Sequence, residues 1–118
     1  HLVGRVRIAQ CPHLYEQADV MFLPTLLECF SASYPEAMRM EVPILTSDLP
    51  FARALCGDAA VYCDSLSAES VVGKLLLLWD ANVRADLCAK GKIRIKEYDT
   101  FDVRAEKYID IIEKNYKS

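Results

Sequence analysis

Residues 19–38 read DVMFLPTLLECFSASYPEAM, and this stretch decides the fold because it joins a strand pattern to a helix start. Residues 19–24 form a short run of large apolar side chains closed by a proline, which is typical of a strand buried on both faces of a parallel sheet. Ser33, Pro35 and Glu36 then follow the pattern of a capping box with a first-turn proline. The stretch predicts a strand, a loop and a helix that begins near residue 33.

The loop 28–32 lies between this strand and this helix, at the position where open α/β folds bind their ligands. The free N–H groups and the dipole of a helix start favour an anion, so the junction suits a phosphate. Two glutamates there each have two interpretations. Glu28 is either a carboxylate that contacts a ligand or a solvated loop residue. Glu36 either binds a ligand or only caps its own helix.

The rest of the chain alternates strand and helix patterns and ends in helices alone. Strands are expected at 2–6, 43–47 and 60–63, and further helices at 13–18, 51–55, from Ser67, at about 82–97 and from Thr100. The last helices have apolar stripes that we interpret as core, at positions 71, 72, 75, 76 and 79 and at positions 101, 105, 108, 109, 112 and 116. This order predicts the α/β class, with a parallel sheet flanked by helices in three layers. We expect one compact domain over residues 1–118.

Composition restricts the class of partner. The chain has 118 residues, a net charge of −3 and no basic stripe, which argues against nucleic acid and against an anionic membrane surface. Its five cysteines are odd in number and lack metal-binding spacing, which favours reduced thiols in a cytoplasmic protein and no zinc. No apolar run approaches the ~20 residues of a membrane span. Because the chain begins at His1, we expect it to be a piece of a longer polypeptide.

Glu28 and Glu36 are separated by seven residues and followed by Ala37 and Met38, a pattern that resembles the E-x7-E motif of the retaining GT-B glycosyltransferases, family 4 in particular. Further segments resemble that family in the same order, at residues 15–19, 22–25, 42–48, 56–62 and 100–108. The resemblance therefore extends along nearly the whole chain. It implies a Rossmann-like fold and, specifically, the later part of the C-terminal domain that binds the nucleotide-sugar, without the N-terminal acceptor domain.

The resemblance also implies roles for single residues. Glu28 lies by the donor sugar as the catalytic residue, and Glu36 binds the ribose hydroxyls of the donor nucleotide, which suits a carboxylate that accepts two hydrogen bonds. Arg5 and Val6 border the base. Backbone amides of the intervening loop meet the sugar and the pyrophosphate; these residues are Cys29, Phe30, Ser31, Ala32 and Ser33. The family usually has glycine at the positions of Ser31 and Glu41, so we expect the loop shape to differ at Ser31.

The function implied is transfer of a hexose, with retention, from a nucleoside-diphosphate sugar to a glycan or lipid-linked acceptor, as in polysaccharide biosynthesis. We expect the parent protein to act without cofactor or metal, because the chain has no Asp-x-Asp motif and no His/Cys cluster. We also expect it in the cytoplasm, with peripheral association at the inner face of the cell membrane left open. The isolated chain is expected to be inactive.

Two alternatives stay open. A sugar-nucleotide epimerase of the same two-domain architecture would convert the donor without any acceptor. A non-catalytic interaction domain that keeps the fold would bind no nucleotide.

Overall fold

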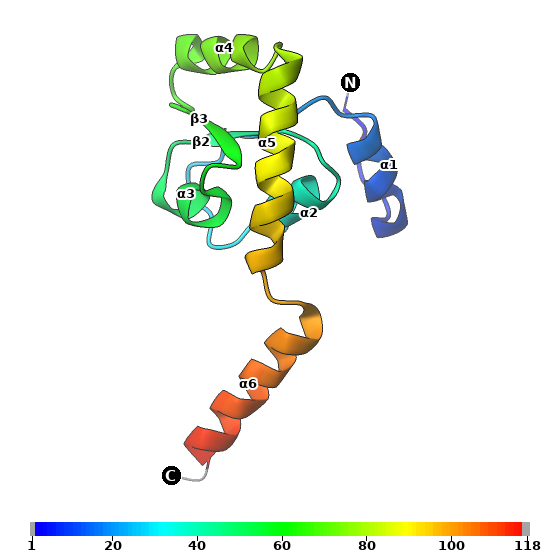
Figure 1. Ribbon diagram of the computed structural model, residues 1–118, viewed down its shortest axis with the longest axis vertical. Helices are drawn as coiled ribbons and strands as arrows, with labels where there is room; N and C mark the ends of the chain where they lie inside the picture. The colour runs from blue at the N-terminus through cyan, green and yellow to red at the C-terminus, as the bar shows by residue number, and fades with distance from the viewer. Residues whose placement is uncertain (1, 117–118) are drawn as a thin grey trace.

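The computed structural model describes residues 2–116, in which helices surround a three-stranded sheet (Figure 1). The strands β1 (Met21–Leu23), β2 (Ile44–Ser47) and β3 (Ala60–Cys63) pair in this order and are all parallel. The helices are η1 (Ile8–Gln10), α1 (Cys11–Glu16), α2 (Ser33–Arg39), α3 (Pro50–Cys56), α4 (Ala68–Leu77), α5 (Ala81–Arg94), η2 (Ile95–Glu97) and α6 (Phe101–Tyr116). Helices connect the parallel strands, which confirms the predicted α/β class.

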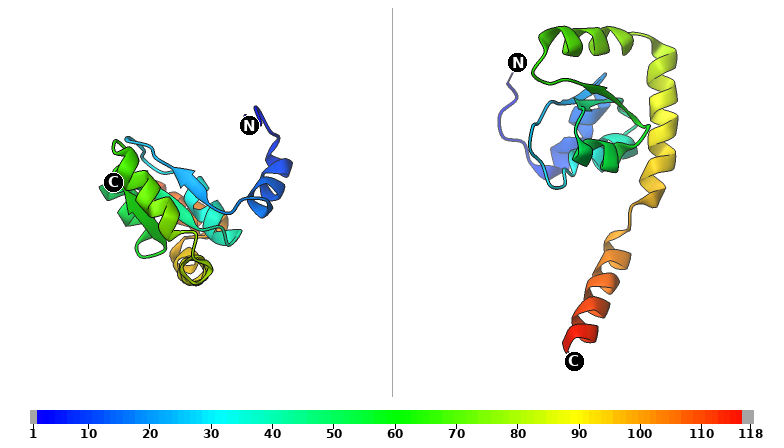
Figure 2. Two further views of the ribbon diagram at one scale, coloured as in Figure 1. Left: turned by 90° about the horizontal axis from the view of Figure 1, so that it is seen from above. Right: turned by 90° about the vertical axis from the view of Figure 1, so that its left-hand side faces the viewer.

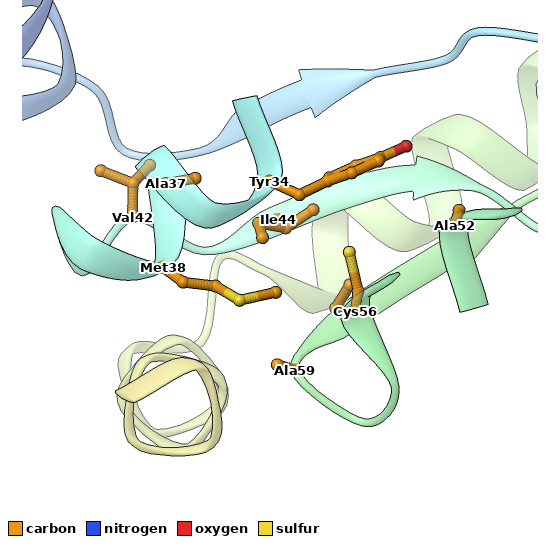
Figure 3. Close-up of a cluster of buried hydrophobic side chains, with 9 residues drawn as sticks. Tyr34, Ala37, Met38, Val42, Ile44, Ala52, Cys56 and Ala59 are labelled. Carbon is orange, nitrogen blue, oxygen red and sulfur yellow. The ribbon is translucent and has the colours of Figure 1, made fainter. Parts of the chain in front are cut away.

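Strand β2 is buried along its whole length because helices cover both faces of the sheet. Ile44 faces α2 and α3, where Figure 3 shows it among Met38 of α2, Cys56 of α3 and other buried side chains. The next residue, Leu45, points to the opposite face, as the alternation of a strand requires. There it packs in a second cluster with Val61, Cys63, Leu78 and Leu87. The result is the predicted arrangement of three layers.

Several local predictions are confirmed. The helix near residue 33 ends at Arg39, before Pro43, and buries Tyr34, Ala37 and Met38 on one face. Ser67 caps α4 by accepting a hydrogen bond from the Ser70 N–H at 3.1 Å. Thr100 stands directly before α6, and its hydroxyl oxygen lies 3.4 Å from the Val103 N–H.

The first predicted strand is wrong, and the second is less buried than expected. Residues 2–6 form no strand and are exposed. In β1 the side chain of Phe22 is 42% exposed, although burial on both faces was expected. Within the described residues β1 is paired along one edge only, by β2. Strand formation depends on a neighbouring strand, so an apolar run without one stays irregular.

Most positions of the apolar stripes in the last helices are not core, which corrects the sequence interpretation, although Val71 of α4 packs against the second cluster. On α4 and in the turn after it, Leu76 is 66% and Trp79 84% exposed. Helix α6 extends away from the sheet, as Figure 1 and the right-hand view of Figure 2 show, and its Phe101 and Tyr116 are also exposed. The radius of gyration is 16.6 Å, against about 13.5 Å for a compact domain of this length. The described part of the chain is therefore less compact than predicted.

Helix α5 connects the two faces of the sheet. Its Leu87 belongs to the second cluster, around Leu45, whereas its Gly91 lies against Met38 of α2, which belongs to the first cluster. A Cβ on Gly91 would lie 3.4 Å from Met38 Cγ, so the two helices approach closely there. Beyond α5, the Tyr98 hydroxyl donates to the Leu55 carbonyl at 2.6 Å and fixes the connection to α6 against the end of α3.

Candidate functional site

The loop between β1 and α2 is held at its start by two hydroxyl residues of β2. Thr46 Oγ1 donates to the Leu23 carbonyl at 2.9 Å, and Ser47 Oγ donates to the Thr25 carbonyl at 2.5 Å. The hydroxyl of Tyr34 lies 2.7 Å from Thr46 Oγ1, where both side chains are buried. Because Thr46 already donates to Leu23, Tyr34 is the donor in this contact. The network therefore ties the end of β1, the end of β2 and the start of α2 together.

Glu28 lies in this loop and is partly buried. Burial raises the pKa of the Tyr34 hydroxyl, and the negative charge of Glu28 acts more weakly in the same direction. Two residues further on, Phe30 packs its ring 6.4 Å from that of Tyr98, at an angle of 57°. The loop thus contacts the connection between α5 and α6.

The helix start differs from the predicted capping box. Ser33 is the first residue inside α2, and Ala32 occupies the cap position without a side-chain hydrogen bond. The Tyr34 N–H already donates to the Ser31 carbonyl at 3.3 Å, and Pro35 has no N–H. The first turn therefore offers an anion fewer backbone donors than the sequence predicted.

Glu36 does not fold back onto its own helix start but accepts a hydrogen bond from another helix. The hydroxyl of Tyr15, in α1, donates to Glu36 Oε2 at 3.0 Å. The pKa of Tyr15 is raised to about 12, mainly by burial and also by the hydrogen bond to Glu36, whereas a hydrogen bond with Ser33 acts in the opposite direction. Tyr15 therefore stays protonated at neutral pH and remains a donor.

These three polar side chains lie at one cavity of about 390 Å³. The carboxylate of Glu36 and the hydroxyls of Ser33 and Tyr15 make its polar part. The rest of its lining is mainly apolar, from Cys11, Leu14, Ala18, Val20 and Met21. Such a cavity suits a ligand that presents hydroxyl groups beside an apolar or aromatic body.

A second cavity of about 420 Å³ also borders Glu36. Phe30 and Ala32 of the loop line it together with two arginines, Arg39 of α2 and Arg104 of α6. The remaining lining residues are Pro35, Ile95, Tyr98, Asp99, Thr100 and Phe101. Glu36 is thus the residue that the two cavities share.

The other residues singled out from the sequence lie outside the linings of these two cavities. Arg5 and Val6 are exposed in the segment before η1, and Cys29 is exposed on the loop. Glu28 and Ser31 are partly buried but border neither cavity. The structure therefore brings Phe30, Ala32, Ser33 and Glu36 to the two cavities, and it does not bring the remaining five there.

Sequence reasoning missed Tyr15, Arg39 and Arg104 as site residues. Tyr15 falls in the segment 15–19 that resembles the family, which was the available signal. Its contact with Glu36 spans 21 residues, however, and no local spacing rule predicts such a contact. The two arginines lie on different helices, α2 and α6, and line the same cavity only because the fold brings these helices together.

Two further properties concern residues 2–116. In that range, no group of three or more histidine, cysteine, aspartate or glutamate side chains converges as a metal site would require. The same range contains no helix that combines the length and the apolar character needed to cross a membrane.

A family model described as "Glycosyl transferases group 1" matches residues 1–81. The matched range covers more than half of the chain and contains the complete sheet, the loop after β1, Tyr15 and both glutamates. No match to a curated protein was found.

Proposed function

Because the chain belongs to the group 1 glycosyltransferases, we propose that it is the later part of the donor-binding C-terminal domain of a retaining GT-B enzyme of family 4. The full-length enzyme transfers a hexose from a nucleoside-diphosphate sugar to a glycan or lipid-linked acceptor. The seven-residue spacing between Glu28 and Glu36 supports the retaining subclass. The loop between β1 and α2 that contains Glu28 supports a donor site at the carboxyl edge of the sheet.

The position of Glu36 is the main support for this proposal. Its carboxylate lies at a cavity of about 390 Å³ whose other walls are largely apolar. A carboxylate accepts hydrogen bonds from both hydroxyls of a ribose, and an apolar wall beside it accommodates a base. Glu36 is exposed, so its charge needs no protein counterion in the absence of ligand. The site therefore suits the nucleoside part of the donor.

Glu28 takes the role beside the sugar. The loop that contains it is anchored at its start by Thr46 and Ser47, which restricts where its carboxylate can lie. A negative charge next to the sugar ring stabilises the positive charge that develops there when the bond to the leaving diphosphate breaks. In this role Glu28 acts through its charge and forms no covalent bond with the sugar.

Transfer by the full-length enzyme is proposed to be independent of metal, with basic residues outside this chain neutralising the diphosphate. A chelator should leave the rate unchanged. Loss of transfer with the chelator, restored by Mg²⁺ or Mn²⁺, would contradict this part of the proposal. The isolated 118 residues should show no turnover, because each missing charged contact to phosphate is worth about 1.5–3 kcal/mol.

A thermal-shift screen of the full-length protein against ADP, GDP and UDP tests donor binding. A ligand that binds only the folded state stabilises it by RT ln(1 + [L]/Kd), which is about 2.7 kcal/mol at a concentration of 100 Kd. One of the three nucleotides should raise the melting temperature strongly. No shift with any of them would refute the donor-site assignment.

A further inference from the structure

The hydrogen bond between Tyr15 and Glu36 joins two helices that are distant in sequence. Tyr15 lies in α1, and its ring packs against the core cluster beneath α2 and α3. Its hydroxyl reaches Glu36 Oε2 at 3.0 Å, whereas Glu36 itself is exposed. A half-buried ring that packs against the core therefore holds one oxygen of an exposed side chain.

The contact engages one of the two carboxylate oxygens. A carboxylate has about four lone-pair sites, so one hydrogen bond to Oε2 leaves Oε1 and further lone pairs available. Both side chains border the cavity of about 390 Å³, so the remaining acceptors lie at its wall. A glutamate without this contact would sample several rotamers, and a ligand would have to select one of them.

We propose that Tyr15 is a positioning residue that orients the carboxylate of Glu36 toward the ribose hydroxyls of the donor nucleotide. This inference rests on the proposed function, because it concerns how Glu36 binds the donor. Tyr15 acts through Glu36 in this account and makes no necessary contact with the ligand. The Tyr15 hydroxyl remains protonated throughout the neutral pH range, so it donates to the Glu36 carboxylate at every pH near 7.

A purely structural role predicts a different outcome. If the hydrogen bond served only to attach α1 to α2, its removal would lower stability and leave nucleotide affinity unchanged once the protein is folded. A positioning role predicts weaker binding with little change in stability, since Tyr15→Phe keeps the packed ring. It also predicts that the effect vanishes when Glu36 is absent.

The test is a double-mutant cycle in the full-length protein with Tyr15→Phe, Glu36→Ala and the double variant. Isothermal titration measures affinity for whichever of ADP, GDP and UDP stabilises the wild type most. Tyr15→Phe alone should weaken binding about 3-fold to 10-fold, the usual effect of one such hydrogen bond. In the Glu36→Ala background the same substitution should change affinity by less than about 2-fold.

Tyr62→Phe is the matched control, because Tyr62 is also half-buried and donates one hydrogen bond, to the Gly57 carbonyl at 2.5 Å. It should leave nucleotide affinity unchanged. Unaltered affinity in Tyr15→Phe, or equal effects of Tyr15→Phe with and without Glu36, would overturn the positioning role while the donor site stands. A wild type that binds none of the three nucleotides would instead overturn the proposed function, and this inference with it.

Discussion

Removing the buried hydroxyl of Tyr34 should destabilise the fold by a defined amount. Tyr34 and Thr46 are both fully buried, and the Tyr34 hydroxyl donates to Thr46 Oγ1 at 2.7 Å. Tyr34→Phe removes one hydrogen bond and leaves a buried acceptor partly unsatisfied, which costs about 1–2 kcal/mol. Thr46→Val should cost more, about 2–3 kcal/mol, because it also removes the donor to the Leu23 carbonyl and leaves the Tyr34 hydroxyl unpaired.

The double variant distinguishes this network from two independent contacts. Once Thr46 is valine, the Tyr34 hydroxyl is a buried donor without a partner, so its removal should cost nothing further. The double variant should therefore be no less stable than Thr46→Val alone. Denaturant unfolding followed by circular dichroism measures the free energies. Additive losses in the double variant would refute the hydrogen-bond network as the source of the stability.

Three other perturbations test separate features. Glu41 has φ of 58°, a left-handed conformation that favours glycine. Glu41→Gly should therefore have a free energy of unfolding about 0.5–1 kcal/mol higher than that of Glu41→Ala, since both variants lack the ion pair with Lys92. An equal or lower value for the glycine variant would contradict the strain. Burial raises the pKa of the Cys56 thiol to about 12. Brief alkylation at pH 8 should therefore modify the exposed Cys29 and spare Cys56, as mass spectrometry would detect. Equal labelling of the two cysteines would contradict the buried position of Cys56. Hydrogen bonding to Arg53 holds the pKa of Asp48 below 3.8, so the ion pair stabilises the fold above pH 3.8 and this stabilisation is lost as the pH falls through the lower, folded-state pKa. Asp48→Asn should therefore lower the free energy of unfolding at pH 7 and approach the wild type in acid. A difference in stability that persists in acid would count against the pair.

Local patterns predicted the elements whose formation depends on neighbours in sequence. The proline before Ile44 and the apolar run after it indicated β2, and the serine at position 67 and the threonine at position 100 indicated helix starts. The elements that were predicted correctly are therefore those that neighbouring residues in the sequence determine. The capping box at Ser33 failed because the helix begins one residue earlier, which leaves Ser33 inside the first turn.

The remaining features depend on contacts between distant segments. Residues 2–6 have the composition of a strand but no strand beside them among the described residues. The stripe on α4 identifies which face is apolar, yet periodicity does not say what covers that face, and Trp79 is exposed. For the same reason the site was predicted around Glu28 and Glu36 without Tyr15, whose contact with Glu36 arises only from the fold.

The donor-binding role of Glu36 is tested most directly by Glu36→Gln in the full-length protein, with nucleoside-diphosphate affinity measured by isothermal titration. Loss of the charged hydrogen bonds to ribose should cost about 1.5–3 kcal/mol, or roughly 10-fold to 150-fold in affinity. The ligand-free melting temperature should barely move, because Glu36 is exposed and caps no helix. Glu69→Gln is the matched control, since Glu69 is an exposed glutamate in the first turn of α4, and it should bind nucleotide like the wild type. Unchanged affinity in Glu36→Gln, with the control equally unaffected, would contradict the account.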